Sequence, residues 1–248
     1  MSLQQDLAIV LLVRDHGESD KIVTLYTLAH GKIVVIAKGA KRSKKRFVNK
    51  LEPFSLLNIQ FATGTRSSLM RLDQAELLAP YPSLRESYDL YLAASLLCEL
   101  VLHWTREHDS DEELFRLLAW GLAGLTTEKS AVKTIIFFHI KMMDILGYRP
   151  FLDGCVDCGI FAAGKGPYRF STLRNGLVCS SCKPAFSDPT LPLSIETVQL
   201  LRKAQDMEQG KLDRLFFSQT ATREALALLK RYDNHLLQRE LHSWNFLS

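Results

Sequence analysis

The segment IVTLYTLAHGKIVVIA, residues 22–37, carries the strongest fold signal in this chain. Two runs of β-branched and apolar residues, 22–28 and 33–37, flank His30-Gly31-Lys32, which is typical of two strands joined by a tight turn. Similar short runs lie at residues 9–13, 56–61 and 68–72. Five short strands near the N-terminus predict a small closed barrel, for which the oligonucleotide-binding (OB) fold is the five-stranded candidate.

The pattern changes at Pro80-Tyr81-Pro82, after which apolar residues recur at three- and four-residue spacing. Helices are predicted at residues 84–104, 112–124, 129–146, about 194–207 and 219–241. The first two are opened by the capping boxes Ser83-x-x-Glu86 and Ser110-x-x-Glu113. The predicted fold class is therefore α+β, with an OB-fold barrel over residues 1–80 and a helical-bundle domain over residues 81–248. A loop-rich zinc-finger insert interrupts that bundle at residues 151–187.

Four cysteines dominate this insert and form two C-x-x-C pairs: Cys155, Cys158, Cys179 and Cys182. Two thiolates separated by two residues can bind one face of a metal ion, and a second pair brought over by a hairpin completes a tetrahedron. Gly154 and Gly159 flank the first pair, and glycine lets the backbone turn its amides toward the sulfurs. The predicted cofactor is one structural zinc ion. Two disulfides or four unrelated core thiols are weaker alternatives, because nothing else in the chain is typical of a secreted protein.

The composition, 47 % apolar and 23 % charged, is that of an ordinary globular protein. The N-terminal residues lack a signal-peptide pattern, and no apolar run reaches membrane-spanning length. We therefore expect a cytoplasmic protein with no membrane partner. The net charge of +4 is unevenly distributed, since residues 1–80 carry 12 Lys and Arg against 7 Asp and Glu. The basic character thus belongs to the predicted barrel.

The second informative stretch is KGAKRSKKRF, residues 38–47, because no acidic residue occurs between Lys21 and Leu51. Cations this dense repel one another unless an anion joins them, and a phosphate backbone supplies that anion. We predict nucleic-acid contacts from Lys38, Lys41, Arg42, Lys44, Lys45 and Arg46. A solvated surface loop is the alternative. Phe47 either stacks on a base or anchors the loop in the core, and the core position is favoured.

No side-chain pattern in the chain reads bases, so binding is expected to be backbone-dominated, salt-sensitive and largely independent of sequence. The chain contains no convincing catalytic motif either, and the prediction is that the protein is not an enzyme. A zinc deaminase needs His-x-Glu and Pro-Cys-x-x-Cys. His16-Gly17-Glu18 fits the first motif, but Gly154 and Val178 occupy the proline positions. Four cysteines also leave no open coordination position. Cys98 and His139 lie on apolar helical segments and are predicted to be core residues.

The stretch GESDKIVTLYT, residues 17–27, is similar to the N-terminal signature of the RecO family of bacterial recombination mediators. The likeness continues through Gly31-Lys32, residues 38–42, Phe47 and Leu51-Glu52-Pro53-Phe54. The helical part resembles the zinc-bearing members of that family. The resemblance implies a non-catalytic protein that binds single- and double-stranded DNA and anneals complementary strands. With RecR, such a protein helps load RecA onto single strands coated by SSB, whose acidic, apolar C-terminal tail it recognises.

This resemblance also implies a place at the nucleoid, within the cytoplasm. Some family members lack the cysteines, so zinc is not expected to be central to the shared activity. The alternative function is an RNA-binding or ribosome-associated OB-fold factor with a structural zinc, because such a factor would have the same barrel pattern and the same basic charge. A zinc-dependent hydrolase or deaminase is the third class, and the closed cysteine set argues against it.

Overall fold

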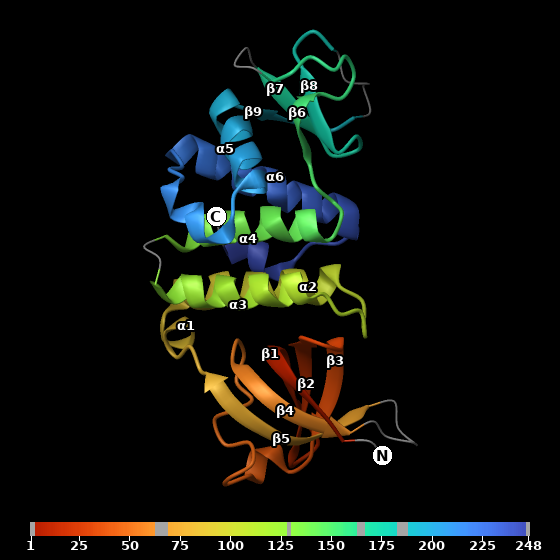
Figure 1. The fold of residues 1–248 in the computed structure, drawn as a ribbon, viewed down its shortest axis with the longest axis vertical. Coiled ribbons are helices and arrows are strands. Elements are labelled where there is room, and N and C mark those ends of the chain that lie inside the picture. Colours follow the sequence, from red (N-terminus) through yellow and green to blue (C-terminus); the bar gives the residue numbers. More distant parts are fainter. Residues whose placement is uncertain (1–2, 63–68, 128–129, 163–166, 183–187, 247–248) are drawn as a thin grey trace. The chain divides into compact units, whose positions relative to one another are not determined.

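The computed structural model describes residues 3–62, 69–127, 130–162, 167–182 and 188–246 (Figure 1). The chain divides into two compact units, residues 1–129 and residues 130–246. The last barrel strand ends at Ala79, and three helices after it belong to the first unit. The domain boundary at residue 80 stays a prediction. In the described part of the chain, no helix combines the length and apolarity needed to cross a membrane.

The first unit contains a closed barrel of strand order β1-β2-β3-β5-β4 (Figure 1). Its strands are β1 (Leu3–His16), β2 (Asp20–Thr27), β3 (Gly31–Ala37), β4 (Leu56–Ala62) and β5 (Met70–Ala79). Neighbouring strands are antiparallel, except that β3 and β5 are parallel. The predicted five-stranded OB-type barrel is therefore confirmed. The predicted run at 68–72 begins at Ser68, which lies outside the described residues.

Strand β3 shows how the sequence forms this barrel. Ile33, Val35 and Ala37 are buried in the barrel core, whereas the alternate residues are half-buried on the outer face. The turn before β3 requires glycine at Gly31, whose φ is +63°. A Cβ atom there would also lie 2.2 Å from the Asp109 carbonyl oxygen. The predicted turn between the second and third strands is thereby confirmed.

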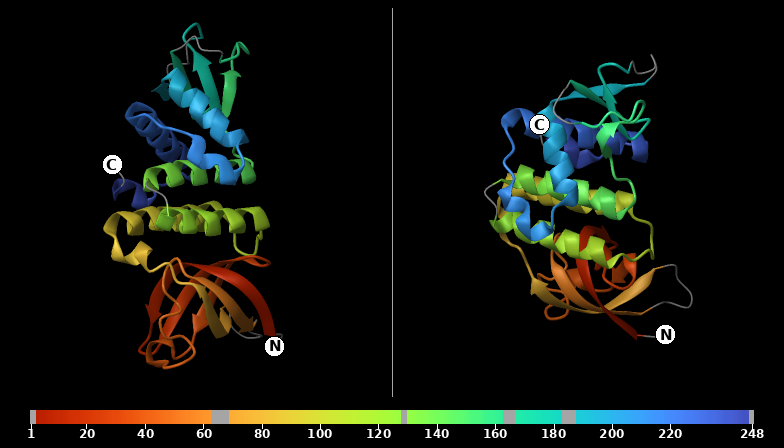
Figure 2. Two further views of the ribbon diagram at one scale, coloured as in Figure 1. Left: turned by 60° about the vertical axis from the view of Figure 1, so that its left-hand side comes forward. Right: turned by 45° about the horizontal axis from the view of Figure 1, so that its top comes forward.

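Three helices complete the first unit: α1 (Ser83–Glu86), α2 (Tyr88–Trp104) and α3 (Glu112–Thr127) (Figure 2). The predicted helix at 84–104 is interrupted at Ser87, whose extended backbone lets its hydroxyl accept the Leu90 N–H. Asp111 accepts the Leu114 N–H at 2.9 Å and caps α3. Both predicted capping boxes are therefore wrong, because residues nearer to each first turn supply the cap oxygen.

The second unit contains three packed helices: α4 (Ala131–Ile145), α5 (Ile195–Asp206) and α6 (Gln219–Leu237). Short 3₁₀ segments lie at η2 (Gln209–Arg214) and η3 (His242–Phe246). Helix α6 ends four residues before its predicted end, because Gln238 takes a left-handed conformation with φ of 52°.

The region of the predicted loop-rich insert forms a four-stranded sheet of order β6-β8-β7-β9, whose last strand lies beyond the predicted end at residue 187. Its strands are β6 (Phe151–Cys155), β7 (Tyr168–Ser171), β8 (Gly176–Cys179) and β9 (Thr190–Leu193), and β6 packs against α5 (Figure 2). All four residues of β8 are buried, so the strand lacks the apolar–polar alternation that reveals a half-exposed strand.

A buried polar group ties the helices of the second unit together. His139 of α4 lies 2.9 Å from one carboxylate oxygen of Asp233 on α6, and the Trp244 indole N–H donates to the other at 2.7 Å. Asp233 thus has a partner for each oxygen, as a buried carboxylate requires. The prediction that His139 is a core residue is confirmed.

Candidate metal centre and nucleic-acid interface

The four cysteine sulfurs lie within 4.8 Å of one another. Cys155 and Cys179 are the last residues of β6 and β8, which are parallel neighbours in the sheet. Because parallel strands end at the same edge, each strand delivers one C-x-x-C pair to a common point. The sheet therefore assembles a four-sulfur site from two segments that are separate in the sequence.

The spacing of the sulfurs fits a metal ion rather than disulfides. The Cys158 and Cys179 Sγ atoms are 3.7 Å apart, and all four cysteines are unpaired thiols. A disulfide needs about 2.05 Å, so that alternative is wrong. Tetrahedral coordination with zinc–sulfur bonds of about 2.3 Å places the sulfurs roughly 3.8 Å apart. The convergence of all four also excludes the alternative of unrelated core thiols.

The backbone around the first pair is shaped to hold these sulfurs. Gly159 has φ of +71°, and its N–H donates to the Cys155 carbonyl at 2.9 Å, which closes the turn. The Cys179 N–H donates to the Cys155 sulfur at 3.3 Å. Gly154 permits the return strand to approach, since a Cβ there would lie 2.8 Å from the Ile160 carbonyl oxygen.

The four thiols of the cluster affect one another's ionisation. Burial opposes ionisation of Cys155, but N–H groups of Cys179, Cys158 and Asp157 outweigh it and lower the pKa to about 6. Hydrogen bonds with Cys158 and Cys179 raise the pKa of Cys182 to about 12. Four adjacent thiolates repel one another unless a cation lies between them. The site can therefore hold a metal ion, and soft thiolate donors suit zinc.

The basic stretch belongs to the connection between β3 and β4, residues 38–55, which begins with η1 (Ala40–Arg42). All six predicted contact residues are exposed. Among the described residues, Lys38, Lys44, Lys45 and Arg46 have no carboxylate within ion-pair distance. The Arg46 guanidinium donates to the Lys38 carbonyl at 2.8 Å and lies 4.7 Å from the centre of the Phe47 ring. We call these four residues the open half of the basic loop.

The other two cations face carboxylates at the end of β1 and on the turn that joins it to β2. The Lys41 ammonium is 3.0 Å from Asp15 and also donates to the Gly17 carbonyl. Arg42 lies 3.7 Å from Glu18. We call Lys41 and Arg42 the paired half of the loop. Sequence reasoning missed these acids because they precede Lys21, where the acid-free stretch begins.

The loop is attached firmly to the barrel. Phe47 is 3 % exposed and belongs to the barrel core, so the core position is confirmed and base stacking by its ring is excluded. At the start of the loop, the Gly39 N–H donates to Asp20 at 2.8 Å. That bond, together with one from Ser19, lowers the pKa of Asp20. The cations are therefore displayed by an anchored loop.

Lys32 is basic but is committed to the fold. Its ammonium donates to the Leu102 carbonyl at 2.6 Å and the Thr105 carbonyl at 2.5 Å, where it satisfies the C-terminal end of α2. Partial burial lowers the pKa of this ammonium. Lys32 therefore does not add to the surface that could meet an anion.

The fold and these two sites define a class: a protein that joins an OB-type barrel with an exposed basic loop to a helical unit holding a four-cysteine metal site. The family description "Recombination protein O N terminal" matches residues 1–81, and "Recombination protein O C terminal" matches residues 85–245. The chain belongs to the recombination protein O (RecO) family, as the signature at residues 17–27 indicated.

Curated relatives agree along nearly the whole chain. The DNA repair protein RecO of Syntrophus aciditrophicus is 36 % identical, over 96 % of this chain and 92 % of the relative. The DNA repair protein RecO of Syntrophobacter fumaroxidans is 35 % identical, over 97 % of this chain and 95 % of the relative. The DNA repair protein RecO of Myxococcus xanthus is 34 % identical, over 100 % of this chain and 98 % of the relative.

Proposed function

We propose that this protein is a non-catalytic, DNA-binding mediator of recombinational DNA repair. Membership of the RecO family and relatives named as DNA repair proteins support this role. The observation that carries it is the open half of the basic loop, which displays cations to solvent on an anchored connection of an OB-type barrel. Such cations gain a partner when a phosphate backbone binds, and the released counterions add to affinity.

The proposed contact residues are Lys38, Lys41, Arg42, Lys44, Lys45 and Arg46. Contacts to phosphates do not distinguish the strand state, so the loop would bind both single- and double-stranded DNA. Partial neutralisation of two strands lowers their mutual repulsion. That effect gives a physical basis for annealing of complementary strands.

The family resemblance supports the proposed partners. In this proposal, the protein acts with RecR to help load RecA on SSB-coated single strands, and it recognises the acidic C-terminal tail of SSB. Its DNA substrate places it at the nucleoid, in the cytoplasm.

The proposed metal is one structural zinc ion, held by Cys155, Cys158, Cys179 and Cys182. When bound, zinc would neutralise the four thiolates and link the ends of β6 and β8. A shell of four cysteines leaves no position for substrate, so the site would stabilise the sheet and take no part in a reaction.

The test of DNA binding is a fivefold alanine variant of Lys41, Arg42, Lys44, Lys45 and Arg46. Affinity for single-stranded DNA is measured by fluorescence anisotropy at several salt concentrations. Each lost phosphate contact lowers the slope of log affinity against log salt by about 0.7, so the slope should fall by up to about 3.5. Unchanged affinity and slope would contradict the proposal. Competition with RNA of the same length distinguishes the alternative, because an RNA-binding factor would prefer the RNA.

A further inference from the structure

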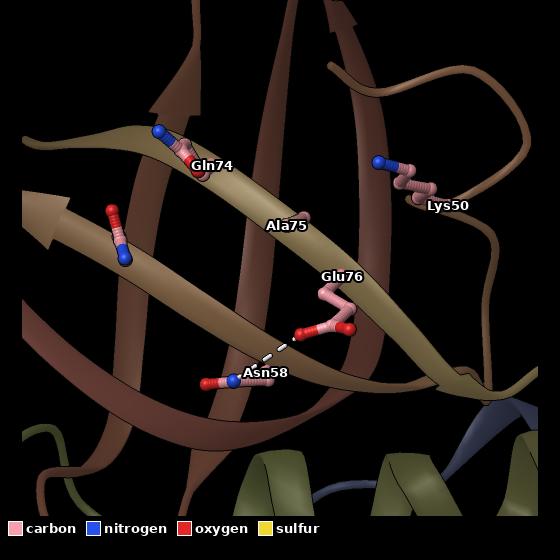
Figure 3. A pocket seen from close by; sticks show the side chains of 6 residues that line it. Lys50, Asn58, Gln74, Ala75 and Glu76 are labelled. Carbon is pink, nitrogen blue, oxygen red and sulfur yellow. Dashed lines mark hydrogen bonds between the residues drawn. The ribbon is translucent and has the colours of Figure 1, made fainter. Parts of the chain in front are cut away.

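The outer face of the barrel carries a second feature, a groove of about 240 Å³ on strands β4 and β5 (Figure 3). We call this the amide groove, and it is lined by Lys50, Asn58, Gln60, Gln74, Ala75 and Glu76.

Strand register explains why the polar side chains gather there. Asn58 is the cross-strand partner of Glu76, and Gln60 is the partner of Gln74. Residues two apart on a strand share a face, so all four project from the same side. The pairing register shifts immediately after Gln60, and such bulges are frequent beside binding sites.

Part of this groove is fixed and part is available. The Asn58 amide oxygen accepts from Gln5 at 3.1 Å, and its NH₂ group donates to Glu76 at 3.5 Å (Figure 3). Within the described part of the chain, the Gln60 and Gln74 side chains make no hydrogen bond. Their donors and acceptors are therefore free to meet a ligand.

The chemistry of the groove favours a base over a phosphate. Its two charged residues, Lys50 and Glu76, have opposite signs and give no net attraction for an anion, and the Glu76 carboxylate can only accept hydrogen bonds. Amides both donate and accept, which matches the mixed edge of a nucleobase. Cytosine carries an exocyclic amine that can donate a hydrogen bond to Glu76. Thymine has a carbonyl oxygen at the corresponding ring position and offers Glu76 no donor there.

The amide groove adjoins the basic loop along the chain. Lys50 lines the groove and belongs to the same connection as the open half, four residues after Arg46. The Lys50 N–H donates to the Phe47 carbonyl, so a turn anchored in the barrel core positions this lysine. A DNA strand whose phosphates lie on the loop can therefore place a neighbouring nucleotide at the groove.

We infer that the amide groove binds one base of a single DNA strand and favours cytosine over thymine. This inference rests on the proposed DNA binding and departs from the expectation that binding is independent of sequence. Duplex DNA engages the same base edges in pairing, so the preference belongs to single strands.

The test compares oligo-dC with oligo-dT of equal length, by fluorescence anisotropy on the full chain at pH 8 and fixed salt. These ligands share their backbone and ring size. The expected result is about fivefold tighter binding of oligo-dC, the low end for a specific base contact. In Gln60→Ala/Gln74→Ala the ratio of oligo-dC to oligo-dT affinity should fall to about one. Glu76→Gln should lower the same ratio, because the carboxylate that discriminates against thymine is gone.

The outcomes separate this inference from the proposed function. Equal wild-type affinities for the two oligonucleotides, with binding still salt-dependent, would overturn the amide groove alone. Absence of any DNA binding would overturn the proposed function. If the double glutamine variant does not fold, as judged by thermal unfolding, an unchanged ratio in Glu76→Gln would overturn the inference. Gln199→Ala, which removes an exposed glutamine on α5 in the second unit, is the control and should keep the wild-type ratio.

Discussion

The cysteine cluster and the basic loop each gather side chains of one chemical kind, but the sulfurs converge on one point whereas the cations are exposed to solvent. The four sulfurs converge until they lie within 4.8 Å of one another, on segments brought together by a sheet. The six cations of the basic loop lie within nine residues, 38–46, and the open half is exposed to solvent. Convergent donors fit one small ion, whereas exposed like charges fit an extended polyanion.

This difference has a consequence for stability. Each cysteine pair reaches the cluster only when β6 and β8 are folded, so ion and sheet depend on each other. The basic loop depends on Phe47 and on the Asp20–Gly39 hydrogen bond, neither of which involves a ligand. We therefore expect the first site to be a folding element and the second to be a binding surface.

The largest expected effect is that of Cys155→Ser combined with Cys179→Ser. Loss of two thiolates should abolish metal binding and unfold the sheet β6–β9, because metal affinity in such sites is folding free energy. Metal content by elemental mass spectrometry should fall from one ion per chain to none. Hydrogen exchange over residues 151–182 should become fast.

DNA affinity of this double variant should stay within about twofold of wild type, since the loop lies in the other unit. Cys98→Ala is the matched control, because Cys98 is a buried cysteine outside the cluster, and it should retain the metal. A variant that stayed fully folded but lost DNA binding would show that the cluster serves the interface.

The second effect is that of Phe47→Ala. Phe47 is buried in the barrel core, so its removal should lower the free energy of unfolding of the barrel by about 3 kcal/mol. Chemical denaturation followed by far-UV circular dichroism measures this change. Phe47→Leu, which keeps most of the apolar volume, should recover much of it. If Phe47→Ala weakened DNA binding without affecting stability, the ring would belong to the interface.

Features that depend on local sequence were predictable. The alternation around Ile33 and Val35, the turn at Gly31 and the C-x-x-C spacing each determine structure over a few residues, and the structure confirms all three. The core position was the favoured prediction for Phe47 and is confirmed, whereas its apolar neighbour Val48 is 46 % exposed.

Features that depend on distant segments were not predictable. The acids that pair with Lys41 and Arg42 precede the acid-free stretch, at the end of β1 and on the turn after it, and only the folded barrel brings them close. The sheet in the insert was missed because burial of all of β8 removes the alternation. The amide groove depends on the register that pairs Gln60 with Gln74, which no local pattern encodes.

The third effect separates the two halves of the basic loop. Lys44→Ala/Lys45→Ala should weaken binding of single-stranded DNA by about tenfold and lower the salt slope by about 1.4, as expected for two phosphate contacts. Lys41→Ala/Arg42→Ala should weaken DNA binding less, because these cations already face Asp15 and Glu18. Anisotropy titrations give both affinities. The control, Lys203→Ala/Arg223→Ala, removes two exposed cations from the second unit and should leave the DNA affinity nearly unchanged. Equal losses in the two loop variants would refute the division into halves.

The smallest expected effect is that of Asp15→Asn/Glu18→Gln, which tests directly whether the paired half of the basic loop is blocked by its carboxylates. Neutral side chains would release Lys41 and Arg42 from their carboxylates, so the paired half would become available to phosphates. Because exposed ion pairs are weak, affinity for single-stranded DNA should rise only about two- to threefold, with a steeper salt slope. Glu208→Gln/Glu240→Gln adds the same net charge in the second unit and controls for long-range attraction. An equal rise in this control would mean that overall charge, and not release of the paired half, governs binding. A rise confined to Asp15→Asn/Glu18→Gln would show that the protein's own carboxylates occupy part of the surface that DNA is proposed to use.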